Sequence, residues 1–84
     1  MNKLEVLIAG EINKVVTGAE TNGPLTATTP LIDDDILSSL ELLQLVMALE
    51  TALSITIPLD ELTGENFSTI SDIAALIERT SDAD

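Results

Sequence analysis

Apolar side chains recur at helical spacing near the N-terminus. Between Asn2 and Val16, intervals of three or four residues separate Leu4, Leu7 or Ile8, Ile12, Val15 and Val16. That spacing predicts an amphipathic helix. Asn2 is suited to cap its start, and Gly18 lies where a glycine often follows a helix end.

The stretch from Thr17 to Leu37 has no helical period over most of its length. It contains Asn22-Gly23-Pro24, several threonines and Pro30, which favour turns or extended chain. No alternating run is long enough to predict a strand. A loop of about 20 residues is uncommon in a compact domain and is often functional. The aliphatic residues expected to hold it onto a core are Leu25, Leu31, Ile32, Ile36 and Leu37.

A second helix is predicted from Ser38 to about Leu53. Its buried side is marked by Leu42 or Leu43, Val46, Leu49 or Glu50, and Leu53. Leu40, Leu43 and Met47 widen the apolar arc beyond the usual stripe of a surface helix. Two explanations fit this arc: deeper burial, which we favour, or a surface for a partner.

The chain between the second and last helices is predicted to be mostly irregular. Ile55–Ile57 precede Pro58 and should avoid the helical conformation, because proline restricts the residue before it. One or two short helical turns are expected, around Leu59–Leu62 and Glu65–Phe67.

The last helix is predicted to begin after Thr69. Thr69 and Asp72 have the spacing of a capping box, with aspartate in place of the usual Glu or Gln. Arg79 suits the negative end of the helix dipole. The expected inner face consists of Ile70, Ile73, Ala74, Leu76 and Ile77.

Together these elements predict an all-α fold. We expect a small bundle of three main helices and one short helix, with a long first loop and no sheet. A single domain should span residues 1–80, followed by a frayed acidic tail at residues 81–84.

Composition removes most kinds of active site. The chain has no cysteine and no histidine, which excludes disulfides, thiolate metal sites, histidine-based triads and zinc hydrolases. Phe67 is the single aromatic residue, so stacking on bases or sugars is not available. We therefore predict no catalytic residues and no enzyme activity, although composition leaves chemistry by carboxylates open.

Charge narrows the choice of partners. The formal net charge is −12, and only Lys3, Lys14 and Arg79 are positive. Such a surface repels nucleic acid and anionic membranes and attracts basic proteins, although the charge also serves simple solubility. No segment has the pattern of a signal peptide or a membrane span, so we expect a soluble cytoplasmic protein. We also expect a monomer.

The carboxylate run Asp33-Asp34-Asp35 is a candidate for binding a metal ion. Counted from Asp33, the sixth and twelfth places of a calcium-binding loop hold Ser38 and Gln44 instead of glycine and glutamate. No specific metal site is predicted, while loose binding of divalent cations to the carboxylates stays plausible.

Two serines stand at the start of the second helix. Ser38 and Glu41 have capping-box spacing, so Ser38 is the expected N-cap and Ser39 the first helical residue. The free N–H groups of a helix start favour an attached phosphate. Spacing alone also fits the simpler explanation that serine is tolerated in a first helical turn.

The run "DDDILSSLELLQLVMALE" resembles the central motif of the acyl carrier protein family. Ser39 matches the serine that carries a 4′-phosphopantetheine arm in that family, and Leu40 matches the leucine after it. "ITIP" resembles the segment before the family's short third helix, and "ENFSTISDIAALIE" resembles its fourth helix. The resemblance extends over nearly the whole chain and implies the acyl-carrier-like four-helix bundle.

Several positions differ from the fatty acid carriers of that family. Ser38 replaces the aspartate of the usual Asp-Ser-Leu motif, and Leu42 and Gln44 make the helix less acidic. "LIDDDILSS" is more similar to D-alanyl and other aminoacyl carriers, with Asp35 where those often have glycine. The segment between Pro58 and Phe67 is also longer. These differences indicate a carrier for a specialised pathway.

The resemblance implies a carrier that holds an acyl or aminoacyl group as a thioester on an arm attached to Ser39. Its implied partners are a phosphopantetheinyl transferase, an acyl or aminoacyl ligase and later pathway enzymes with basic surfaces. Contacts with them should be transient and salt-sensitive, within a field from Asp33–Asp35, Asp60 and Glu61. The expected partner-binding residues are Leu40, Glu41, Gln44, Met47 and Glu50. The alternative is an unmodified carrier-like interaction module, which the change at Ser38 supports.

Overall fold

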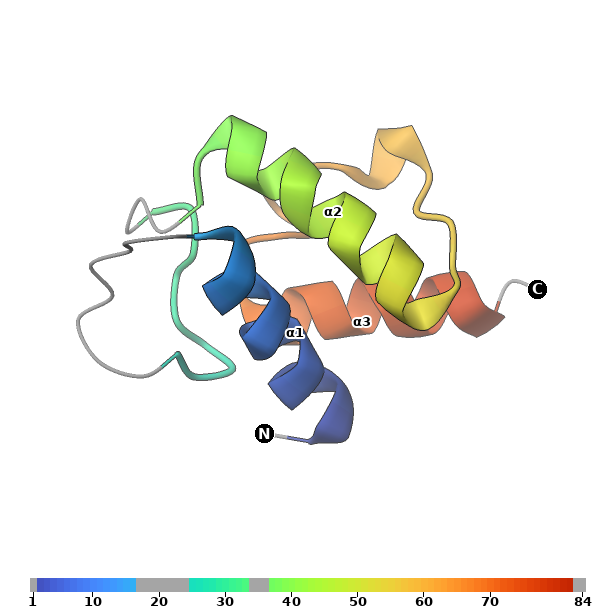
Figure 1. Cartoon of the computed structure of the whole chain (residues 1–84), viewed down its shortest axis with the longest axis horizontal. Helices are drawn as coiled ribbons and strands as arrows, with labels where there is room; N and C mark the ends of the chain where they lie inside the picture. The colour runs from blue at the N-terminus through green and yellow to red at the C-terminus, as the bar shows by residue number, and fades with distance from the viewer. Residues whose placement is uncertain (1, 17–24, 34–36, 83–84) are drawn as a thin grey trace.

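The computed structural model describes residues 2–16, 25–33 and 37–82, and the regular elements within them are all helical (Figure 1). The elements are α1 (Lys3–Val15), α2 (Ser39–Leu53), the 3-10 turn η1 (Leu59–Glu61) and α3 (Ile70–Asp82). This confirms the predicted all-α architecture of three main helices and one short one. None of these helices is long and apolar enough to cross a membrane.

α1 begins with a complete capping box. The Asn2 side chain accepts from the Glu5 N–H at 2.8 Å, and the Glu5 carboxylate accepts from the Asn2 N–H at 2.9 Å. The predicted cap at Asn2 is therefore confirmed. Val16 is the C-terminal cap, while Gly18 lies outside the described residues. α1 packs against both α2 and α3, which makes it the central helix of the bundle (Figure 1).

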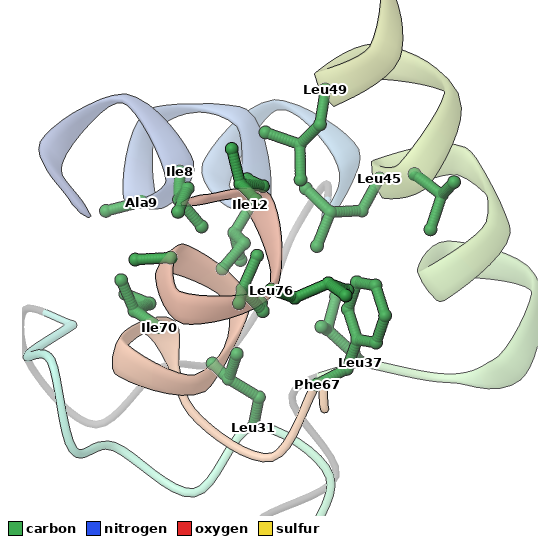
Figure 2. Packing of buried hydrophobic residues seen from close by; sticks show 14 of the residues in the cluster. Ile8, Ala9, Ile12, Leu31, Leu37, Leu45, Leu49, Phe67, Ile70 and Leu76 are labelled. Carbon is green, nitrogen blue, oxygen red and sulfur yellow. The ribbon is translucent and has the colours of Figure 1, made fainter. Parts of the chain in front are cut away.

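The core lies where the inner faces of the three helices meet (Figure 2). Phe67 lies just before α3 and is fully buried, so the chain's one aromatic side chain is structural. The five apolar residues expected on the inner face of α3 are all buried, as predicted. The other fully buried large side chains are Ile8, Ile12, Leu31, Leu45 and Leu49.

The described part of the first loop is fastened to the start of α3. The Leu31 N–H donates to the Ser68 carbonyl at 2.8 Å, and the Ser71 N–H donates to the Ala27 carbonyl at 3.0 Å. Leu25, Leu31 and Leu37 are buried and Ile32 is half-buried, which confirms that aliphatic residues hold this loop to the core. Ile36 lies outside the described residues.

The structure corrects the prediction for the wide apolar arc of α2. Leu45, Val46 and Leu49 are buried, whereas Leu40, Leu43 and Met47 are exposed. Our preference for deeper burial of this arc was therefore wrong. α2 packs closely against α1, and a chain of this size has too little mass to cover the opposite side of the helix as well.

The region before α3 has less helix than predicted. η1 is a single 3-10 turn within the expected Leu59–Leu62, and residues 65–67 form a turn. The Thr69 hydroxyl oxygen accepts from the Asp72 N–H at 3.1 Å, as predicted. Asp72 does not complete the box through the Thr69 N–H; its carboxylate accepts from the Thr69 hydroxyl at 2.9 Å. α3 continues to Asp82, two residues into the predicted tail.

Candidate functional site

The start of α2 is organised by Ser38. Its backbone is extended, with φ −82° and ψ 172°, and its side chain accepts from the Glu41 N–H at 3.2 Å. The Glu41 carboxylate accepts from the Ser38 N–H at 2.9 Å. This is the predicted capping box, and it fixes the direction in which the chain enters the helix.

Ser39 is the first helical residue and is exposed. Its hydroxyl forms no hydrogen bond with any of the residues that the structure describes, because Ser38 performs the capping. The N–H groups of Ser39 and Leu40 belong to the first turn, where no intrahelical acceptor exists. An exposed hydroxyl beside the positive end of a helix dipole fits a phosphodiester, which carries a negative charge.

The predicted partner-binding residues divide into two groups. Leu40, Gln44 and Met47 are exposed together on the side of α2 that faces away from α1. Glu41 and Glu50 are half-buried, and their carboxylates bind backbone N–H groups of this chain. Leu43 is also exposed on the outer side; the sequence placed it in the wide apolar arc but not among the expected partner-binding residues. Its signal was the spacing of three residues from Leu40.

Glu50 organises the other end of α2. Its carbonyl accepts from the N–H groups of Ser54 and Ile55, where Ser54 closes the helix with a left-handed φ of 54°. Its carboxylate Oε2 accepts from the Ile57 N–H at 2.7 Å. No spacing rule predicts this side-chain bond, because it joins residues seven positions apart across an irregular segment.

The predicted acidic field is only partly described. Asp33 and Asp60 are exposed, whereas Asp34 and Asp35 lie outside the described residues. The Glu61 carboxylate accepts from the Asn66 side-chain Nδ2 at 2.9 Å, and the Asn66 side-chain Oδ1 accepts from the Arg79 guanidinium at 3.3 Å. Within the described residues, no three acidic side chains are grouped as a metal site.

Comparison with known families agrees with this geometry. Residues 11–77 match the family model described as "Phosphopantetheine attachment site", which covers most of the 84 residues. The chain therefore belongs to the phosphopantetheine-binding carrier protein family. A search of curated proteins found no match.

Family membership establishes the type of function. The chain is a non-catalytic carrier domain whose cofactor is covalently attached 4′-phosphopantetheine. Such a domain requires a phosphopantetheinyl transferase to attach the cofactor and client enzymes to use it. The matched range contains the whole of α2 and both serines at its start.

Proposed function

We propose that Ser39 carries the 4′-phosphopantetheine arm and that the chain presents an acyl or aminoacyl group to enzymes of a specialised biosynthetic pathway. The observation that carries this proposal is the division between two neighbouring serines. Ser38 is engaged in the helix cap, whereas the Ser39 hydroxyl is exposed and has no hydrogen-bond partner among the described residues.

The chain's own residues then have distinct parts. Ser39 Oγ becomes an ester oxygen of the phosphodiester, and the first-turn N–H groups of α2 stabilise its negative charge. The bound arm supplies a thiol that holds the cargo as a thioester. Ser38 and Glu41 keep the helix start rigid, so the arm leaves from a defined point.

Three positions in and beside α2 support the proposal that the client enzymes belong to a specialised pathway. Leu42 and Gln44 make α2 less acidic than the matching helix of fatty acid carriers, and Ser38 stands where their motif has aspartate. The partners we propose are an acyl or aminoacyl ligase and later enzymes with basic surfaces. They contact the outer side and edges of α2 through Leu40, Glu41, Gln44, Met47 and Glu50.

The test is intact-mass measurement after co-expression with a broad-specificity phosphopantetheinyl transferase. The wild type and Ser38→Ala should each gain the mass of one phosphopantetheine group, and Ser39→Ala should gain none. Because loss of the Ser38 cap costs about 1 kcal/mol, circular dichroism should check that the Ser38→Ala variant is folded. Gain of the group by Ser39→Ala would place the attachment elsewhere and contradict the proposal.

The alternative is an unmodified carrier-like interaction module; the family match argues against it, and the serine at position 38 is the observation that favours it. Ser38→Asp restores the motif's charge and keeps a good N-cap, because aspartate and serine cap equally well. If the arm is attached to the wild type, this variant should be modified faster. If neither protein gains mass with any transferase tried, the alternative is supported.

A further inference from the structure

The side-chain amines of this chain are few and lie on one side of α1. Lys3 and Lys14 are the only lysines, and both are exposed. They are eleven residues apart, so at 3.6 residues per turn they lie within about 20° of one another around the helix. The fully buried Ile12 lies about 180° from Lys3 on the same count. Because the buried side of α1 packs against α2 and α3, both lysines lie on the side that faces away from α2.

α2 has none of the side chains that readily take an acyl group from a thioester. The range Ser39–Leu53 contains no lysine, and the whole sequence has no cysteine and no histidine. Amines and thiolates attack acyl groups directly, whereas hydroxyl groups need a neighbouring base. The carboxylates of Glu41 and Glu50 accept from the backbone N–H groups of Ser38 and Ile57, at 2.9 and 2.7 Å. The surface that follows the proposed attachment site is therefore unreactive toward a thioester.

The basic groups elsewhere in the chain are engaged by other side chains. Lys14 Nζ donates to Glu11 Oε2 at 3.2 Å, and the Arg79 guanidinium donates to Asn66 Oδ1 at 3.3 Å. An ammonium group has no lone pair with which to attack a carbonyl, and the guanidinium of arginine stays protonated in proteins. Neither group attacks an acyl group while it donates these bonds.

We infer that the chain holds its cargo without being acylated by it, because its lysines lie on the far side of α1 from the arm. The inference rests on the proposed attachment at Ser39, which lies at the start of α2. It extends that proposal to the class of cargo. The cargo is an acyl or aminoacyl thioester that is reactive enough to acylate a lysine, and a carrier with amines on α2 would consume it.

The reaction that the chain avoids is transfer of the acyl group from sulfur to nitrogen. The unprotonated amine of a lysine attacks the thioester carbonyl, a C–N bond forms and the C–S bond breaks. The thiolate leaves and takes up the proton that the amine gives up, so the products are an amide and the thiol of the arm. A short tether gives such an amine an effective concentration of roughly millimolar, so a lysine within reach would compete with the client enzymes.

The test attaches a reactive arm by chemistry, without a transferase. Ser39→Cys introduces the only cysteine of the chain, and an iodoacetamide reagent that ends in an acetyl thioester alkylates it. In this parent chain, Leu43→Lys adds an amine about 6 Å along α2 and on the same side as position 39. Met47→Lys adds one about 12 Å along the helix. Both positions are exposed, and circular dichroism checks that each variant folds.

Intact mass and peptide mapping then follow the acetyl group. The alkylated parent should lose its thioester no faster than the same reagent coupled to N-acetylcysteine, and its lysines should stay unmodified. Leu43→Lys should form a lysine amide at least about tenfold faster than the parent, at a rate that does not depend on protein concentration. Met47→Lys should do the same, and it carries the comparison if Leu43→Lys does not fold.

Asn13→Lys in the parent chain is the matched control. It makes the same change of charge as the two α2 variants, at an exposed position of α1 next to Lys14. Its thioester should survive as long as that of the parent. The inference is overturned if Asn13→Lys forms amide as fast as the α2 variants, if those variants form none, or if the parent acylates Lys3 or Lys14 through its own arm.

The two proposals fail separately. If no transferase adds mass at Ser39 while the chemically attached arm keeps its thioester, only the proposed function is contradicted. If Ser39 is modified but the chemically attached arm acylates the lysines of the parent chain, only this inference is contradicted.

Discussion

At the scale of single residues, neighbouring positions in this chain have different structural roles. Ser38 accepts the hydrogen bond that starts α2, while the exposed hydroxyl of Ser39 has no partner among the described residues. Gly10 is another residue whose side-chain position makes no contact that the fold requires. It is exposed inside α1, and apart from its chain neighbours and the nearby backbone of its own helix, no heavy atom of the described residues lies within 4 Å of where a Cβ would be.

Gly10→Ala is therefore expected to stabilise the protein. Alanine favours the helix over glycine by roughly 0.5–1 kcal/mol, because glycine loses more backbone freedom on folding. Urea denaturation followed by circular dichroism should show a higher midpoint with an unchanged slope. Ala9→Gly, at a buried neighbour, is the opposite control and should lower the midpoint. A lower midpoint for Gly10→Ala would mean that the glycine has a role in α1 that the structure does not show.

At the scale of elements, the connection from α2 to η1 depends on Glu50. This residue accepts backbone N–H groups through both its carbonyl and its carboxylate, on either side of the left-handed Ser54. The Ile57 side chain is buried beside this connection, just before Pro58 and η1. Glu50 thus sets how the chain leaves α2, whether or not a partner also contacts it.

Glu50→Ala should destabilise the protein by about 1–3 kcal/mol, because it leaves the Ile57 N–H without its acceptor. Glu50→Gln should lose much less, since its amide oxygen can accept the same bond. Thermal unfolding of both variants beside the wild type measures the difference. Equal losses for the two variants would show that the charge, and not the hydrogen bond, is what matters. Equal stability of all three proteins would show that the bond contributes nothing.

At the scale of the whole molecule, the net charge is strongly negative. The chain has fifteen acidic residues and three basic ones. Within the described residues a single ion pair is present, between Lys14 and Glu11 at 3.2 Å, and Lys14 is largely exposed. An exposed pair of this kind contributes little, so repulsion among the carboxylates opposes folding at low ionic strength.

The melting temperature should therefore rise with salt. The distance over which charges repel one another, the Debye length, shortens from about 30 Å at 0.01 M salt to about 10 Å at 0.1 M. Most of the rise in melting temperature should therefore come below a few tenths molar. Differential scanning calorimetry in NaCl, KCl and choline chloride measures it. Equal rises in the three salts indicate screening, whereas a rise with one cation alone would indicate specific binding. A melting temperature that does not change would contradict the repulsion.

Much of this molecule follows from local sequence. Ser38 starts α2 as its capping-box spacing predicts, and Asn2 caps α1 as its residue type predicts, because a cap involves residues only three positions apart. The inner face of α3 follows from its period for the same reason. Membership of the carrier family was likewise visible in the residues around Ser39, and the match over residues 11–77 confirms it.

Tertiary structure decided what local pattern left open. The apolar arc of α2 fits either burial or exposure by its sequence. Which of the two occurs depends on the neighbours that a small bundle can place around the helix. α1 covers one side of α2, and Leu40, Leu43 and Met47 stay exposed. The bond from Ile57 to Glu50 and the attachment of the first loop to α3 also join residues far apart in sequence. The sequence by itself determined where helices begin and which family the chain belongs to. Only packing decided which apolar residues remain at the surface, because burial depends on distant parts of the chain.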